Sequence, residues 1–132
     1  MSDNQQLTEI EQAKADAQEL VRLNGLLTTA KTAAATAVEN AAAAEFGSQD
    51  AITEAETSKT KAQLVIDAAQ AVKDHAKSGS AEHTTASEDV TDATAAFNKA
   101  SELYEKSIRD NKEYLDELNR LNGLLTTAKT AA

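Results

Sequence analysis

A block of thirteen residues that occurs twice constrains the fold of this chain more than any other feature. Residues 22–34, with the sequence RLNGLLTTAKTAA, recur without change as residues 120–132, at a spacing of 98 positions. Upstream of the block the likeness decays, although Leu20 and Leu118 still match. Likeness at a fixed spacing is typical of tandem repeat proteins. The sequence therefore predicts a tandem array with a period of 98 residues.

The repeat also predicts how the chain divides. We expect the end of a preceding repeat or linker helix at residues 1–21, one full three-helix repeat at 22–119, and the start of the next repeat at 120–132. The whole chain would then fold as one three-helix unit. An engineered copy of one segment at both ends is the alternative, but a copied block would stop abruptly instead of decaying.

Apolar and small residues recur at alternating spacings of three and four, which is the pattern of a heptad seam. Three such stripes follow one another, and the second is interrupted at Lys59, whose long stem can cover apolar surface. Each stripe predicts a helix with one buried face. The stripes comprise Ala13, Leu20, Leu23, Leu27, Ala30, Ala34, Ala37, Ala41 and Ala44; then Ile52, Ala55, Ala62, Ile66, Ala69, Val72 and Ala76; then Val90, Ala93, Phe97, Ala100, Tyr104, Ser107, Asn111, Tyr114, Leu118, Leu121, Leu125, Ala128 and Ala132.

Two short polar segments separate the stripes. Residues 46–50 (FGSQD) and 78–82 (SGSAE) each combine a glycine, which suits a helix C-terminus, with a serine or an acid, which suits the next N-terminus. We therefore expect helices at about residues 7–45, 49–77 and from 81 onward. The predicted fold class is all-α: an elongated, antiparallel, up-down-up three-helix bundle with coiled-coil-like heptad packing.

The Asn-Gly pairs at residues 24–25 and 122–123 leave one local question open. In isolation Asn-Gly favours a turn. The leucine stripe nevertheless keeps its phase across Gly123, and one glycine inside a helix costs only about 1 kcal/mol relative to alanine. We expect a helical linker here, with a true helix break as the alternative.

Composition narrows the classes of function. The chain has 22 acidic and 13 basic residues, a net charge of −9, and no cysteine, proline or tryptophan. This acidity argues against nucleic-acid binding, and no segment is apolar enough for membrane insertion. Because Leu, Ile, Val and Phe make up only 23 of 132 residues, the core is predicted to be thin and rich in alanine. We expect an elongated monomer.

Three-helix modules of about a hundred residues joined by a continuous linker helix resemble spectrin repeats. A spectrin repeat normally carries a core tryptophan in its first helix, which this chain lacks. The Ala- and Thr-rich, aromatic-poor character is more similar to the three-helix arrays of giant bacterial surface adhesins, and the block from Leu23 (LNGLLTTAK) is loosely similar to such modules. The resemblance implies an extracellular or cell-surface stalk that holds a distal adhesive domain away from the cell wall.

No catalytic, cofactor-binding or metal-binding residue is assigned from the sequence, and we expect no enzyme activity. His75 and His83 flank the second turn beside Asp74 and Glu82, so a surface metal site can be drawn, but no third buried ligand accompanies them. Other acids cluster on predicted exposed faces, where a general acid lacks the desolvation that it needs: Glu54, Glu56, Asp110, Glu113, Asp116 and Glu117.

Side chains of the last helix carry three further expectations. Asn111 falls on the seam, where an amide fixes register at some cost in stability. Phe97, Tyr104 and Tyr114 also fall on the seam and are predicted to be core residues. Acid-base pairs four residues apart favour a helix, and the chain has three of them here: Glu102 with Lys106, Glu105 with Arg109, and Asp116 with Arg120.

Three classes of function remain. The favoured one is a structural spacer of a large surface protein, whose partners are the neighbouring repeats and whose host or surface ligand binds other domains. An intracellular cytoskeletal or signalling rod is the alternative within that class. The second class is a helical module that binds a host or partner protein. The third, an ice-binding helix, is suggested by threonines between Thr28 and Thr36, but their spacing departs from the regular row that it needs.

Overall fold

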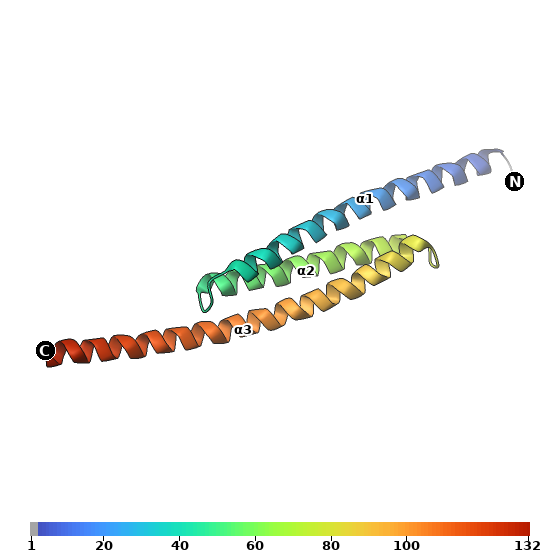
Figure 1. The fold of residues 1–132 in the computed structure, drawn as a ribbon. Coiled ribbons are helices and arrows are strands. Elements are labelled where there is room, and N and C mark those ends of the chain that lie inside the picture. The colour runs from blue at the N-terminus through green and yellow to red at the C-terminus, as the bar shows by residue number, and fades with distance from the viewer. Residues whose placement is uncertain (1–2) are drawn as a thin grey trace.

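The computed structural model describes residues 3–132 and consists of three helices joined by two short turns (Figure 1). Helix α1 spans Asp3–Ala43, α2 spans Gln49–His75, and α3 spans Ala81–Ala131. The helices run up, down and up as predicted, and their bounds lie within a few residues of those expected. The described residues contain no strand. The prediction of an all-α three-helix bundle is confirmed.

Both turns use the predicted cap chemistry. Gly47 and Gly79 have positive φ angles of 76° and 83°, a conformation that side chains with a Cβ rarely adopt. The hydroxyl oxygens of Ser48 and Ser80 then accept hydrogen bonds from main-chain N–H groups in the first turn of α2 and α3. Each turn therefore ends one helix and begins the next within a few residues.

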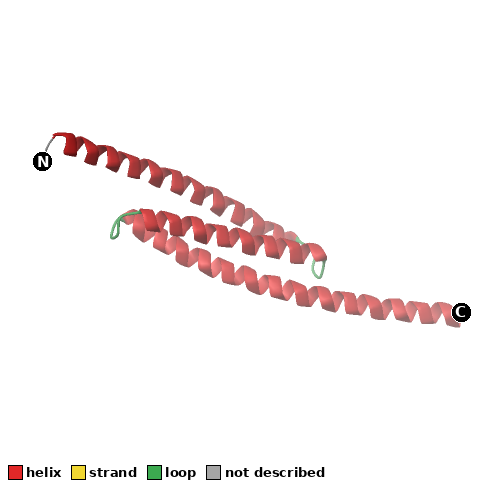
Figure 2. Ribbon diagram, turned by 180° about the vertical axis from the view of Figure 1, so that it is seen from behind, coloured by secondary structure: helices red, strands yellow, loops and turns green. Residues whose placement is uncertain are grey.

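The helices are longer than the bundle that they form. At 1.5 Å per residue, α1 is about 60 Å long, α2 about 40 Å and α3 about 75 Å. The N-terminal part of α1 extends beyond one end of the bundle, and the C-terminal part of α3 extends beyond the other (Figures 1 and 2). The particle is consequently a rod of about 95 Å.

Helix α2 lies between α1 and α3 and holds the bundle together, because it packs along both of them while α1 and α3 hardly touch each other. Small side chains form most of this packing, and the bulkier buried ones are Leu27, Val65 and Val72. The buried cluster consists of Leu27, Val65, Ala69, Val72, Ala86 and Ala93, with Leu20, Leu23, Ala30, Ala34, Ile66, Ala68 and Val90 packed against it. The core is thin, as the composition predicts.

The two copies of the repeated block adopt the same local structure. Both Asn-Gly pairs lie inside helices, so the predicted helix through these positions is confirmed and the alternative of a turn is wrong. Thr28 donates a hydrogen bond to the Asn24 carbonyl (3.0 Å), and its counterpart Thr126 donates to the Asn122 carbonyl (2.9 Å). The copies differ in their surroundings.

That difference is clearest at one pair of leucines. Leu27 is 4% exposed in the bundle, whereas its counterpart Leu125 is 52% exposed beyond it.

Four expectations about side chains need correction. Tyr114 is 52% exposed and is not a core residue, because α3 leaves the bundle at this point. Lys106 pairs with Asp110 (2.6 Å), and Arg120 pairs with Glu117. These pairs replace those of Glu102 with Lys106 and of Asp116 with Arg120, because a base can also reach an acid three residues before it or four residues after it. The expected pair of Glu105 with Arg109 is not among the ion pairs of the described residues.

The interruption at Lys59 has a clear physical role. Its ammonium nitrogen lies 5.6 Å from the ring centre of Phe97 and 5.7 Å from that of Tyr104. The cation therefore covers two half-buried aromatic faces of α3, an arrangement that contributes about 0.5–1 kcal/mol at exposed sites. A polar residue on the seam of α2 thus still contributes to helix packing.

The two copies of the block supply a matched test of the core. Leu27→Ala is expected to lower the free energy of unfolding by about 2–4 kcal/mol, because it removes a buried leucine from a thin core. Leu125→Ala, in the same local sequence, is expected to change it by less than about 0.5 kcal/mol. Urea unfolding followed by circular dichroism measures both. Equal losses would mean that residues 120–132 are packed in this chain.

The glycines give a second test. Gly47→Ala is expected to destabilise the protein by more than Gly79→Ala, although both have positive φ. A Cβ at Gly47 would lie 3.1 Å from the Cβ of Tyr114, whereas the space around Gly79 is open. Gly79→Ala therefore measures only the cost of a positive φ angle for a residue with a Cβ, which is about 1–2 kcal/mol of unfolding free energy.

Gly25→Ala is the control for the glycine series. Gly25 lies within a helix with no atom near its added Cβ, so alanine should stabilise α1 by up to about 1 kcal/mol. Thermal unfolding should therefore give the highest melting temperature for Gly25→Ala, a lower one for Gly79→Ala and the lowest for Gly47→Ala. Destabilisation at Gly25 would contradict the continuous helix.

Candidate functional site

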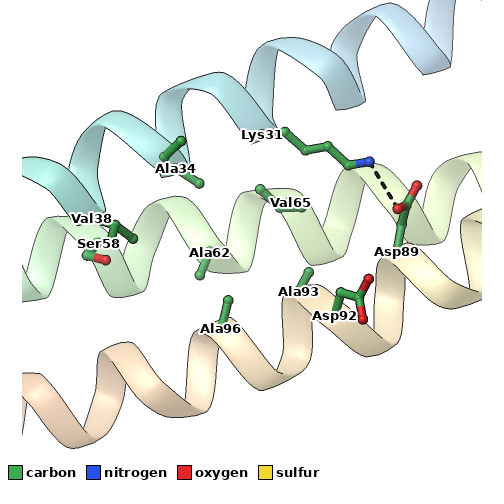
Figure 3. A pocket seen from close by; sticks show the side chains of 11 residues that line it. Lys31, Ala34, Val38, Ser58, Ala62, Val65, Asp89, Asp92, Ala93 and Ala96 are labelled. Carbon is green, nitrogen blue, oxygen red and sulfur yellow. Dashed lines mark ion pairs between the residues drawn. The ribbon is translucent and has the colours of Figure 1, made fainter.

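One hollow of the molecule is a groove between α1 and α3, with α2 as its floor (Figure 3). It exists because α1 and α3 each pack on α2 and hardly on each other. Its volume is about 340 Å³. Most of the lining residues are apolar, namely Ala34, Ala35, Val38, Ala62, Val65, Ala93 and Ala96. The polar ones are Lys31, Ser58, Asp89 and Asp92.

One ion pair crosses this groove. The Lys31 ammonium on α1 lies 3.0 Å from a carboxylate oxygen of Asp89 on α3. The Asp89 side chain is only 17% exposed, so the pair is better shielded than a fully exposed one. Asp92 lies one turn further along α3 on the same rim (Figure 3). The pair therefore links two helices that have few other contacts.

The lining of the groove is suited to the packing of apolar groups. Its walls are small aliphatic side chains, and they can accept an apolar side chain or a small apolar molecule. Ser58, which is almost fully buried, supplies the one hydroxyl in the lining.

The two histidines take part in different contacts. His75 lies with its Nε2 atom 2.9 Å from the main-chain oxygen of Asp16 and so connects the end of α2 to α1. His83 lies in the first turn of α3, and its main-chain N–H donates to the Ser80 hydroxyl. Among residues 3–132, no three metal-ligating side chains are grouped to hold an ion.

Two carboxylates at equivalent positions of the repeat, Glu19 and Glu117, form local helix pairs with an arginine. The hydrogen bond from Arg120 lowers the pKa of the Glu117 carboxyl from its usual value, and Arg22 does the same to Glu19 in the first copy of the block. In each pair the guanidinium Nε lies 2.9 Å from a carboxylate oxygen. The same pair forms in the packed copy and the exposed copy, so it depends only on helix geometry.

Asn111 joins α3 to the first turn. Its side-chain amide donates a hydrogen bond of 2.8 Å to the main-chain oxygen of Gly47. The heptad pattern predicts Asn111 as a seam residue that fixes register, but it does not predict the hydrogen bond to the Gly47 carbonyl. The bond positions the end of α1 against α3 at the level where α3 leaves the bundle.

Beyond Asn111, α3 exposes a row of leucines. Leu118, Leu121 and Leu125 are 40%, 48% and 52% exposed. Their counterparts Leu20, Leu23 and Leu27 pack into the core cluster. The leucines that the first copy buries in the bundle therefore form an exposed apolar row in the second copy. None of the three helices within residues 3–132 combines the length and hydropathy needed to cross a bilayer.

Filling the groove tests its openness. Ala96→Leu is expected to raise the free energy of unfolding by about 1 kcal/mol, because the larger side chain adds apolar contacts between α3 and the rest of the bundle. Ala95→Leu, on the same exposed turn but outside the lining, is the control and should have no such effect. Thermal unfolding measures both. A stabilisation shared by both variants would contradict the groove.

Comparison with known proteins gives no relative for this chain: no family model, no curated protein and no solved structure matches it.

Proposed function

We propose that this chain is a structural spacer, one repeat of a rod-like array in a large multi-repeat protein. One observation carries the proposal. Helix α3 continues beyond its own bundle as a second copy of residues 22–34, the segment through which α1 packs into the bundle. The second copy, residues 120–132, has the same helical structure but leaves its leucines exposed. The α2 and α3 helices of a following repeat would cover them.

The path of the chain suits end-to-end addition. The two helical extensions leave the bundle at opposite ends, so each further repeat continues the rod without folding back (Figure 1). Helix α3 of one repeat would become α1 of the next, with Gly123 inside the shared helix. Because α2 runs backward between two forward helices, each repeat of 98 residues would lengthen the rod by about 50 Å.

The proposal includes a setting for the array. The stalk would project distal binding domains of an adhesin from an extracellular surface, and those domains would bind the host or surface ligand. This part is supported by the resemblance in architecture and in Ala- and Thr-rich composition. Within the chain, the partners of a repeat are its neighbours.

A binding module is the second candidate, and the groove between α1 and α3 favours it. Its apolar floor and its charged rim at Lys31 and Asp89 are features that a partner side chain could use. The repeated block favours the spacer, because a binding module with this groove gives no reason for a second copy of residues 22–34.

Scattering from a longer chain tests the spacer. A two-unit chain is defined by the repeat itself: residues 1–132 followed directly by a second copy of residues 35–132. Small-angle X-ray scattering should show a maximum dimension of about 95 Å for the single chain and about 145 Å for the two-unit chain. A two-unit chain that is no longer than one unit, or that behaves as two beads on a flexible string, would contradict a rigid spacer.

A further inference from the structure

We propose that, in such an array, the α1–α2 turn of one repeat packs against the α2–α3 turn of the next, with Phe46 as the central contact. The inference rests on the proposed function, because the partner is a second copy of this repeat joined through α3. The surface is formed by Phe46, Gly47 and Tyr114, and we call it the exit surface. Its occupant is the segment 76–80 of the following repeat.

The exit surface carries the most exposed aromatic side chains of the chain. Of the four aromatic residues, Phe97 and Tyr104 lie under the ammonium of Lys59. Phe46 is 70% exposed and Tyr114 is 52% exposed. Aromatic side chains gathered on an exposed surface are typical of protein interfaces, and a turn needs no phenylalanine for its own geometry.

The exposed aromatic residues are held in place. The Lys106 ammonium lies 5.2 Å from the ring centre of Phe46, and Asn111 donates its hydrogen bond to the Gly47 carbonyl. A Cβ added to Gly47 would lie 3.1 Å from the Cβ of Tyr114, so the turn is in close contact with α3. The exit surface is therefore formed before any partner arrives.

The second turn can be placed from contacts within the present repeat. His75, at the end of α2, lies 2.9 Å from the main-chain oxygen of Asp16. At the spacing of 98, Asp16 corresponds to Tyr114. His75 of the following repeat would therefore reach the main-chain oxygen of Tyr114, the residue whose side chain already lies against Gly47. One residue of α3 would thus contact both turns.

Both turns lie on the same side of the shared helix. Asn111 and Tyr114, which face the first turn, and Leu118, which would face the next bundle, follow one another at spacings of three and four. Positions at these spacings lie along one face of a helix. The two turns would consequently meet end to end. An arrangement with the turns on opposite sides of the shared helix is excluded.

The chemistry of the second turn suits this contact. Ser78, Gly79 and Ser80 are small, and no side chain lies within 4 Å of a Cβ added to Gly79. Small residues allow a close approach of the turn to an aromatic ring. Lys77 is exposed in the same turn and supplies a second cation beside Phe46.

Cross-linking in the two-unit chain tests the inference, because the natural sequence has no cysteine. The facing pair is Phe46→Cys in the first unit with Ser78→Cys in the second. The reversed pair, Ser78→Cys in the first unit with Phe46→Cys in the second, is the matched control, since these sites lie at the two far ends. A short bismaleimide at low protein concentration should join the facing pair within one chain and leave the reversed pair unjoined.

A stability measurement supplies a second readout. Phe46→Ser in the first unit should lower the melting temperature of the two-unit chain by about 2–4 °C, whereas the same change in the second unit should leave it unchanged. Equal cross-linking of the two pairs, or equal effects of the two serine variants, in a chain that does reach about 145 Å would overturn the junction and leave the spacer standing. A chain that fails to lengthen overturns the spacer itself.

Discussion

The packing of α2 against both neighbours is the constraint on which the rest of the structure depends. Helices α1 and α3 scarcely contact each other, so each is held mainly through α2. That packing uses alanines such as Ala55 and Ala69, both fully buried. Small side chains let helices approach closely but bury little apolar area each. The groove, the ion pair across it and the cation of Lys59 over two rings all follow from this thin interface.

The sequence predicts the parts of the fold that depend on local chemistry. Gly47 and Ser48 end one helix and begin the next through conformational preference and capping, and these properties need no distant partner. The heptad stripes likewise identify Leu27, Ala69 and Ala93 as buried. Helix through the Asn-Gly pairs could be predicted because the stripe keeps its phase there. The sequence also offered no set of catalytic or metal ligands that the fold could bring together.

What could not be predicted depends on where the helices separate. Tyr114 lies on the seam, yet it is exposed because its helix has passed the end of the bundle. The groove beside Val38 arises from the distance between two helices, which the stripe on either one does not determine. Leu27 and Leu125 are the clearest case. They have identical neighbours in sequence, yet Leu27 is buried and Leu125 is exposed. Periodicity identifies the face that can be buried, and the tertiary partner decides whether it is.

The central position of α2 also determines how a rod of such units would respond to tension. A load applied to the two helical extensions pulls α1 and α3 in opposite directions along α2. The resistance is then shear along two interfaces of small side chains, with the Lys31–Asp89 pair as the direct link between the loaded helices. Sliding breaks contacts that are individually weak and chemically alike, and a displaced alanine can meet the next alanine in the row. In the proposed spacer, such a load would be shared by many weak contacts and carried by no single strong one.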